Sequence, residues 1–174
     1  MSDIAIDVFN YIFTAILIGV FLAWISLIFS MYKSFTKTPY LDKFENSSKQ
    51  IPKVSIILPA RNEEKFIGTC LESFIQQDYT NYEILAVDDS SDDKTWEIIE
   101  KYARSSEKVV PVKAEPKPHG WMGKNWACME GFKRATGDLL LFTDADTRYS
   151  EKVISFAVAH LLSEKLDVLT VIPR

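Results

Sequence analysis

An uncharged stretch of 25 residues near the amino terminus, Val8–Tyr32, sets the strongest limit on what this chain can fold into. Twenty of its residues are hydrophobic. A helix of this length reaches roughly 37 Å at about 1.5 Å per residue, enough to cross a hydrocarbon core of about 30 Å. A buried helix of a soluble domain is rarely this long, and a cleavable signal peptide would begin with basic residues and have a shorter apolar core. The segment instead follows Asp3 and Asp7 and continues into Lys33, so we predict a membrane-spanning anchor within residues 1–33.

The charges that flank this segment predict its orientation. No Lys or Arg precedes it, whereas five lysines follow it. These are Lys33, Lys37, Lys43, Lys49 and Lys53. Because basic residues stay on the cytoplasmic side of a membrane, residues 33–174 are predicted to lie in the cytoplasm as part of a single-pass protein. Residues 34–53 form a predicted basic juxtamembrane linker whose charge suits anionic headgroups, which makes the lipid membrane a predicted partner.

The charge balance and the cysteine count exclude two classes of protein. Residues 54–174 carry 15 basic against 20 acidic side chains, and the whole chain has a net charge of −4. A nucleic-acid-binding protein would present a broad basic face, so no nucleic acid is expected as a partner. Two cysteines exclude a small scaffold held by disulfides, and a cytoplasmic domain agrees with Cys70 and Cys128 as free, buried thiols.

Beyond the linker, short β-branched runs alternate with amphipathic stretches. Strands are predicted at Val54–Leu58, Glu83–Val87, Val109–Lys113, Asp138–Phe142 and Asp167–Ile172. Helices are predicted from Phe66 to Ile75 and over residues 94–104, 125–135 and 151–164, with Asn62 capping the first and Ser150 the last. This alternation is typical of an α/β fold with a mainly parallel sheet that helices cover on both faces. Residues 54–174 are therefore predicted to form one domain.

Polar and acidic residues follow three of the predicted strands. Pro59–Glu64 comes after the first strand, Asp88–Asp93 after the second and Thr143–Asp146 after the fourth. Because Asp, Ser and Asn are also ordinary residues of turns and helix caps, each cluster alone has a structural explanation. In an open parallel sheet, however, ligands bind beyond the carboxyl ends of the strands. Carboxylates crowded there repel one another unless a cation or hydrogen-bond donors are present, so the three clusters together predict a binding site.

Asp144 and Asp146 are the candidate metal ligands, because two acids at a strand end can approach one ion. Mg²⁺ and Mn²⁺ prefer carboxylate oxygens, take one or two of them from the protein and complete their shell with substrate phosphates. The implied arrangement is a metal that bridges a diphosphate. The sequence contains neither the phosphate loop of nucleoside triphosphatases nor the dinucleotide-binding glycine fingerprint. His119 and His160 are too far apart in sequence to suggest a zinc site.

Four motifs in this order resemble the amino-terminal, nucleotide-binding half of a family 2 glycosyltransferase of the GT-A fold. They are Pro59-Ala-Arg-Asn-Glu63, Val87-Asp-Asp-Ser-Ser-Asp-Asp-Lys-Thr95, Gly123-Lys-Asn-Trp-Ala127 and Thr143-Asp-Ala-Asp146. The resemblance covers residues 54–174, and Gly120–Ala127 is similar to membrane-bound members that glycosylate lipids or polyisoprenoid-type acceptors. It implies a domain that binds a nucleotide-diphosphate sugar through a metal, for transfer to a lipid or glycan acceptor.

The resemblance also implies roles for individual residues. Those placed beside the nucleotide are Pro59, Ala60, Arg61, Glu63, Asp88, Asp89, Lys124 and Asp144. Asp88 or Asp89 would bind the base, and Lys124 would face the diphosphate. Asp144 would lie near the ribose and the sugar, and Asp146, together with Asp144, would bind Mg²⁺ or Mn²⁺. A cation and a lysine at this point would stabilise the charge that develops on the departing diphosphate.

The sequence departs from the family pattern where the catalytic base is concerned. The family's general base and acceptor-site motif lie well beyond the Asp-x-Asp segment, whereas this sequence ends at Arg174, 28 residues after Asp146. The later acids Glu151, Glu164 and Asp167 belong to the next predicted helix and strand, so the base is expected beyond Arg174. Three explanations stay open: a fragment, a second chain that supplies the acceptor half, or a protein that binds a donor without transferring it. We expect this chain alone to bind but not to transfer a sugar.

Two other functions compete with a glycosyltransferase. A catalytically inactive nucleotide-sugar-binding or membrane-anchoring subunit would share all the features above. A nucleotidyltransferase uses a related sheet and a metal, but it carries a glycine-rich basic loop directly after the first strand. Pro59–Glu64 contains no glycine, which disfavours that alternative.

Overall fold

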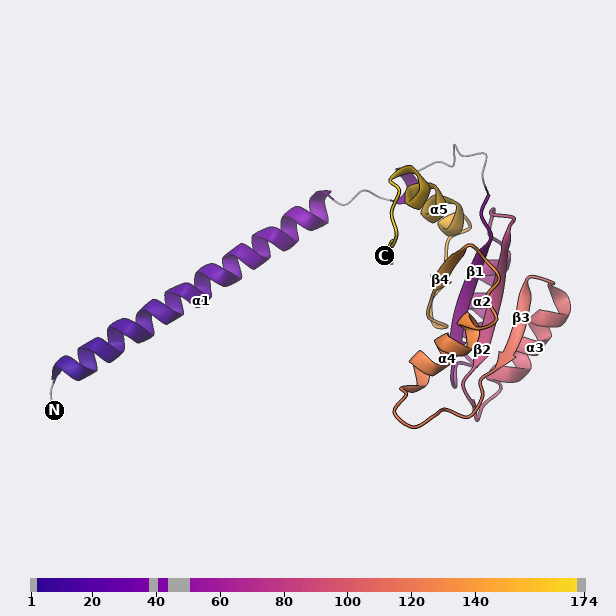
Figure 1. Cartoon of the computed structure of the whole chain (residues 1–174), viewed down its shortest axis with the longest axis horizontal. Helices are drawn as coiled ribbons and strands as arrows, with labels where there is room; N and C mark the ends of the chain where they lie inside the picture. The colour runs from indigo at the N-terminus through magenta and orange to yellow at the C-terminus, as the bar shows by residue number, and fades with distance from the viewer. Residues whose placement is uncertain (1–2, 38–40, 44–50, 172–174) are drawn as a thin grey trace. The chain divides into compact units, whose positions relative to one another are not determined.

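The computed structural model describes residues 3–37, 41–43 and 51–171, and the chain divides into two units, Met1–Tyr40 and Leu41–Arg174. The first unit contains one long helix, α1 (Asp3–Lys37), drawn in indigo and violet in Figure 1. The most apolar window of 18 residues within Ile6–Thr36 has a mean hydropathy of 2.6. No side chain from Ile6 to Thr36 is buried. A helix pairs its interior backbone groups internally, as a hydrocarbon environment requires. The predicted segment Val8–Tyr32 therefore lies in a helix that is long and apolar enough to cross a membrane.

The second unit contains a parallel sheet with four described strands in the order β3-β2-β1-β4. The strands are β1 (Val54–Ala60), β2 (Tyr82–Asp88), β3 (Val109–Lys113) and β4 (Leu139–Phe142). The helices are α2 (Ile67–Ile75), α3 (Thr95–Ser105), α4 (Gly123–Phe132) and α5 (Val153–Ser163), and a short 3-10 helix, η1 (Leu41–Lys43), precedes β1. In β1, Ile56 lies opposite Ile84 of β2 and Leu141 of β4. The predicted parallel α/β architecture is confirmed.

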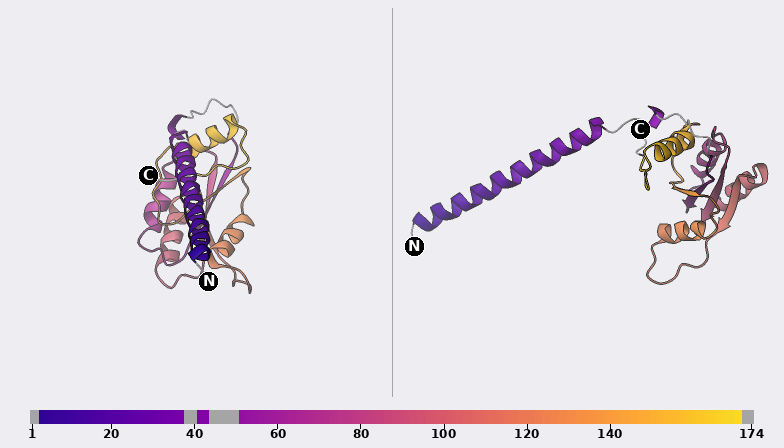
Figure 2. Two further views of the ribbon diagram at one scale, coloured as in Figure 1. Left: turned by 90° about the vertical axis from the view of Figure 1, so that its left-hand side faces the viewer. Right: turned by 45° about the horizontal axis from the view of Figure 1, so that its top comes forward.

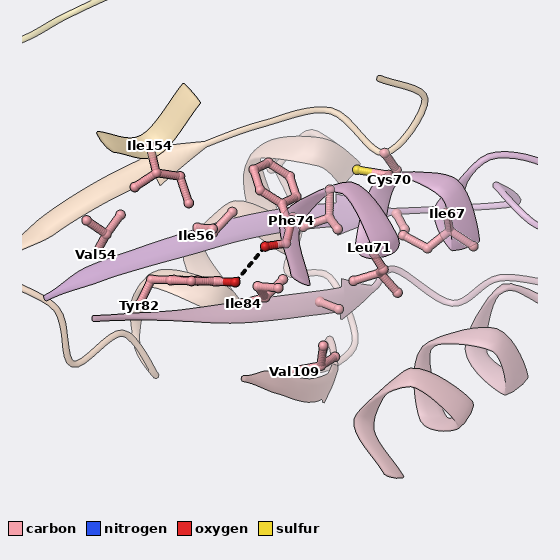
Figure 3. Packing of buried hydrophobic residues seen from close by; sticks show 14 of the residues in the cluster. Val54, Ile56, Ile67, Cys70, Leu71, Phe74, Tyr82, Ile84, Val109 and Ile154 are labelled. Atoms are coloured by element: carbon pink, nitrogen blue, oxygen red, sulfur yellow. Dashed lines mark hydrogen bonds between the residues drawn. The ribbon is translucent and has the colours of Figure 1, made fainter. Parts of the chain in front are cut away.

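Helices cover both faces of the sheet (Figure 2). β1 is buried along its whole length. On one face Ile56 belongs to an apolar cluster with residues of α2, α3 and α5, including Phe74. On the other face Ile57 packs in a cluster with Ala127 of α4, because successive strand residues point to opposite faces. Figure 3 shows the first cluster, in which the hydroxyl of Tyr82 donates a 2.6 Å hydrogen bond to the carbonyl oxygen of Phe74. This bond ties the last turn of α2 to β2.

The fifth predicted strand, Asp167–Ile172, is wrong over the part that the structure describes. Residues 167–171 form no strand, and the last residue of the predicted strand lies outside the described residues. Val168 is 79% exposed. A strand needs a neighbouring backbone to pair with, and the described sheet ends at β4, where Leu140 and Phe142 are also exposed. β-branched composition alone therefore overpredicts a strand here.

Both predicted helix caps are also wrong. α2 begins at Ile67 without a side-chain cap bond. Asn62 has a left-handed φ of 56° and accepts a hydrogen bond from the N–H of Asp92 through its side-chain oxygen. α5 begins at Val153 without a side-chain cap bond, and Ser150 contributes only its carbonyl oxygen, 3.2 Å from the nitrogen of Val153. Residue type predicts a cap only where the backbone also enters the helix at that residue.

α4 lies so close to the sheet that there is no room for a side chain at Gly131. A Cβ atom there would lie 2.7 Å from Cγ2 of Ile57 and 3.1 Å from Cγ2 of Val87. Both neighbours are themselves completely buried, so they have little freedom to move away. Gly131 therefore sets the distance between α4 and the sheet.

We expect Gly131→Ala to lower the free energy of unfolding of the full-length protein by about 1–3 kcal/mol, the usual cost of overpacking a core. Gly68→Ala is the matched control, because Gly68 is also helical and its added Cβ would make only ordinary contacts of 3.6 Å or more. Urea unfolding in detergent, followed by circular dichroism, measures both variants. Equal stabilities would contradict the close packing of α4.

A second constraint lies at the opposite end of the sheet, where Glu83 of β2 joins the starts of β1 and β4. Its carboxylate accepts hydrogen bonds from the hydroxyl of Ser55 (2.5 Å), the N–H of Thr136 (2.9 Å) and the ammonium of Lys53 (3.0 Å). Burial raises the pKa of Glu83, but these hydrogen bonds outweigh it and lower the pKa to about 2. Because the folded pKa is depressed, Glu83 stabilises the fold above its ordinary pKa of 4.5 and loses that contribution as the pH falls towards 2.

At neutral pH we expect Glu83→Gln to be less stable than the wild-type protein, since an amide cannot accept all of these hydrogen bonds. The difference should shrink as the pH falls from 4.5 towards 2, because the wild-type carboxylate becomes protonated while the glutamine does not titrate. Chemical unfolding of both proteins across this range measures the difference. A difference that stays constant with pH would show that the Glu83 hydrogen bonds do not depend on its charge.

Candidate functional site

A pocket of about 360 Å³ lies beyond the carboxyl ends of β1 and β4, beside the first turn of α4. It is lined by Pro59, Ala60, Arg61, Glu63, Asp89, Gly123, Lys124, Ala127, Asp144, Ala145 and Asp146. Eight of the predicted site residues are in this set, and Asp88 is not. Sequence reasoning assigned no site role to Gly123, Ala127 and Ala145. The signal that could have found Gly123 and Ala145 is their position next to a predicted charged residue in the same motif.

The loops after β1 and β2 hold each other in place through side-chain hydrogen bonds. The N–H of Asn62 donates to the hydroxyl of Ser91 at 3.0 Å, and the N–H of Glu63 donates to the hydroxyl of Thr95 at 2.8 Å. That hydroxyl in turn donates to the carboxylate of Asp93 at 2.5 Å. Ser91, Asp93 and Thr95 therefore serve the structure of the two loops, and the turn explanation of this cluster holds for them.

Asp88 is the last residue of β2 and only 5% of its surface is exposed. Its Oδ2 accepts a long hydrogen bond of 3.4 Å from the N–H of Ser91, and its Oδ1 has no hydrogen-bond partner among the described residues. A buried carboxylate oxygen without a donor is costly, and native structures rarely contain one without a reason. The atom belongs to the residue directly before Asp89, which lines the pocket.

Asp89, in the loop after β2, contacts the end of β1 and lies beside the first turn of α4. Its N–H donates to the carbonyl oxygen of Ala60 at 2.9 Å, and its Oδ2 lies 3.9 Å from Nη1 of Arg61. A Cβ atom on Gly123 would lie 2.8 Å from the same Oδ2. The lack of a side chain at Gly123 therefore lets the first turn of α4 approach Asp89.

The acids that follow β1 and β4 meet on the other side of the pocket. Lys124 forms an ion pair with Asp144, and this hydrogen bond raises the pKa of the lysine. Burial raises the pKa of Glu63, and the negative charges of Asp146, Asp93 and Asp144 raise it further. The folded chain therefore brings together carboxylates that lie about 80 residues apart in the sequence.

The thiol of Cys70 lies directly behind this acidic side. Cys70 is buried and free, and its Sγ donates a weak hydrogen bond of 3.6 Å to the carbonyl oxygen of Asp144. Burial raises the pKa of the thiol to about 12, and the charges of Asp146 and Asp144 add to the effect. Cys70 therefore stays protonated at physiological pH and acts as a packing residue. Cys128 is also free and is half-buried.

The donor set of the pocket can be compared with what a metal ion requires. Within residues 3–37, 41–43 and 51–171, no group of three or more His, Cys, Asp or Glu side chains is arranged to hold a metal. Asp144 and Asp146 offer two carboxylates, the number that Mg²⁺ usually takes from a protein when phosphates complete its shell. The pocket therefore fits a cation that binds together with a diphosphate better than one held by protein ligands alone.

Residues 55–174 match the sequence profile of glycosyl transferase family 2. The chain belongs to this family. Among its relatives, the probable glycosyltransferase YdaM of Bacillus subtilis is 28% identical over 163 residues, which cover 87% of this chain and 38% of that protein. A 4,4'-diaponeurosporenoate glycosyltransferase of Staphylococcus haemolyticus is 36% identical over 99 residues, which cover 57% of this chain and 25% of that protein. This family 2 chain thus spans about a quarter to two fifths of these relatives.

Solved structures of glycosyltransferases share its fold. Residues 1–349 of TarS from Staphylococcus aureus, in complex with UDP, align with a TM-score of 0.55 at 28% identity, over 70% of this chain and 38% of that one. The mannosyltransferase PcManGT from Pyrobaculum calidifontis, in complex with GDP-Man and Mn²⁺, aligns with a TM-score of 0.62 at 25% identity, over 84% of this chain and 43% of that one. The predicted GT-A fold is confirmed.

Proposed function

We propose that this chain is the donor-binding part of a membrane-anchored glycosyltransferase, which binds a nucleotide-diphosphate sugar for transfer to a lipid or glycan acceptor. The observation that carries this proposal is the pocket with two chemically different sides. One side has Lys124 in the first turn of α4 together with Asp144 and Asp146 after β4. The other side has Asp89, whose neighbour Asp88 keeps one carboxylate oxygen without a hydrogen-bond partner among the described residues. A diphosphate with its cation suits the first side, and a base with an N–H donor suits the second. UDP and GDP-Man in the two solved relatives support this class of ligand.

The nucleoside is proposed to bind at the ends of β1 and β2. Pro59–Arg61 and Glu63 line the pocket beside Asp89, and they would lie along the base and the ribose. Uracil and guanine both present a ring N–H on their pairing edge, which a carboxylate at the end of β2 would accept. Asp89 lines the pocket and is held by Arg61 and by the backbone of β1, while Asp88 lies buried directly before it.

The diphosphate is proposed to bind at the first turn of α4. The first N–H groups of a helix have no partner within the helix and carry partial positive charge, which makes this end an anion site. Gly123 and Lys124 of this turn line the pocket, and α4 has no side-chain cap bond among the described residues. Lys124 adds a full positive charge at the same place. It would stabilise the negative charge that develops when the sugar leaves the diphosphate.

Asp144 and Asp146 are proposed to hold Mg²⁺ or Mn²⁺, which when bound neutralises phosphate oxygens and so assists the departure of the nucleoside diphosphate. Ala145 between them is 5% exposed and packs in the apolar cluster that contains Ile56 of β1. That packing fixes the backbone between the two acids, so that both line the pocket. The Mn²⁺ in the Pyrobaculum calidifontis mannosyltransferase supports a divalent cation in this family.

For the whole chain we propose an anchor in residues 1–33, a basic linker in residues 34–53 and a donor-binding domain in residues 54–174. The apolar stretch of α1 and the lysines that follow it support a single-pass protein with its domain in the cytoplasm. In this arrangement the donor comes from the cytoplasm, and the membrane holds the domain near a lipid-linked acceptor.

The metal dependence of donor binding follows from the two carboxylates. We expect UDP or GDP to bind the detergent-solubilised protein in Mg²⁺ or Mn²⁺ but not in EDTA. Asp146→Ala should weaken binding about tenfold or more, because even supporting residues of metal sites typically contribute about 10–100-fold to metal affinity. Glu151→Ala is the matched control, since Glu151 is an exposed acid nearby in the chain that does not line the pocket. Calorimetry that finds equal affinity in EDTA, or no effect of Asp146→Ala, would refute the metal site.

The membrane orientation is tested by fractionation and protease access. We expect the full-length protein to stay in the membrane fraction after washing with high salt and with carbonate, because a spanning helix is not held by charge. Protease should digest residues 54–174 in inside-out vesicles and leave them intact in right-side-out vesicles. Recovery of the protein in the soluble fraction without detergent, or the opposite protease pattern, would overturn this proposal.

A further inference from the structure

The charged side chains that line the pocket form two ion pairs and leave two acids over. The four acids and two bases are Glu63, Asp89, Asp144, Asp146, Arg61 and Lys124. Arg61 pairs with Asp89 and Lys124 pairs with Asp144, which uses both bases. Glu63 and Asp146 have no basic partner among the residues that the structure describes. Four negative and two positive charges give the lining a formal charge of −2, which one divalent cation would neutralise.

Lys124 is the base in this lining that touches a candidate metal ligand. It comes from the first turn of α4, 20 residues before Asp144, and its ammonium contacts Oδ1 of that carboxylate. Both side chains are more than half exposed, at 62% for Lys124 and 57% for Asp144. Exposed ion pairs contribute little stability and are readily broken, so the pair can separate without disturbing the fold.

The two tasks of Lys124 conflict when a cation and a diphosphate are present. A divalent cation on Asp144 and Asp146 repels an ammonium group on the same carboxylate. A diphosphate at the first turn of α4 attracts that ammonium group, whose long flexible side chain can follow it. The contact between Lys124 and Asp144 therefore belongs to the protein without a donor, and it must give way when the donor complex forms.

We propose that Lys124 is an exchangeable counterion, which pairs with Asp144 in the absence of ligands and moves to the diphosphate when a divalent cation takes its place at Asp144 and Asp146. The inference rests on the proposed function in naming a diphosphate as the second partner. It assigns Lys124 a positioning role in addition to a binding role: the lysine opposes a cation that binds alone and favours a cation that binds with a nucleotide.

This exchange couples the two ligands. A cation alone must displace the lysine from Asp144, whereas a cation that arrives with a diphosphate gives the displaced lysine a new partner. By linkage, the factor by which a nucleotide raises the affinity for the cation equals the factor by which the cation raises the affinity for the nucleotide. Removing the ammonium group should reduce this shared factor. It should raise the affinity for the cation alone and lower the affinity for the nucleotide in the presence of the cation.

The decisive experiment is a titration of the detergent-solubilised full-length protein with Mn²⁺ alone, with free Mn²⁺ measured by electron paramagnetic resonance. We expect Lys124→Gln to bind Mn²⁺ up to about fivefold more tightly than the wild-type protein, the range given by exposed ion pairs. The same variant should bind UDP or GDP in saturating Mn²⁺ about tenfold more weakly, because a charged hydrogen bond to phosphate is lost. Thermal unfolding of each variant checks that the fold is intact.

Arg61→Gln is the matched control, because it removes one positive charge from the same pocket, but from a residue paired with Asp89. We expect it to leave the affinity for Mn²⁺ alone unchanged. An equal gain in Arg61→Gln would overturn the exchange, since it would mean that any positive charge in the pocket repels the cation. Unchanged or weaker Mn²⁺ binding by Lys124→Gln, or no Mn²⁺ binding by either protein, would overturn it as well. Failure of every form to bind a nucleotide would instead count against the proposed function and leave the Mn²⁺ comparison valid.

Discussion

β1 is buried along all seven of its residues, and the parts of the candidate site take their places from what packs against it. It pairs with β2 over its full length and with β4 over four residues, which brings the ends of three strands to one edge. Apolar side chains alternate between its two faces, so helices must cover both. α4 is positioned in this way: Gly131 in its last turn lies close to Ile57 and Val87. Lys124 in its first turn pairs with Asp144. The pocket thus results from the pairing of β1 with β2 and β4 and from the helices that cover its two faces.

Much of this arrangement could be predicted from the sequence, because the alternation of apolar strands and amphipathic helices leaves few other folds. Predicting that Asp89 and Asp144 meet at one edge needed only the rule that parallel strands end at the same edge. The place of Lys124 came instead from the resemblance to family 2 glycosyltransferases. Asn62 and Ser150 show where such reasoning fails. Each is a residue type that often caps helices, but a cap depends on backbone angles that a single sequence does not reveal.

The same limit applies to the acidic loop after β2. In the sequence Asp88, Asp89 and Asp93 are three similar acids of one loop. Their different roles become visible only in the folded chain. Asp93 accepts hydrogen bonds within the loop, Asp89 pairs with Arg61, and Asp88 keeps one oxygen without a partner among the described residues. Distinguishing them requires knowing which N–H groups the neighbouring loop presents, and those come from residues about 30 positions away. The sequence does not reveal the role of Gly123 for a related reason. Gly123 matters because a side chain at this position would collide with the carboxylate of Asp89.

The exposed position of β4 gives the two sides of the pocket unequal mechanical support. The nucleoside side follows β1 and β2, which pair over seven residues and whose loops are bonded to each other. The side with Asp144 and Asp146 follows a strand of four residues that pairs along one edge only within the described sheet. The backbone there is held by the packing of Ala145 in the apolar cluster and by the thiol of Cys70 on the carbonyl oxygen of Asp144. Strand pairing thus supports the first side of the pocket, and side-chain packing supports the second.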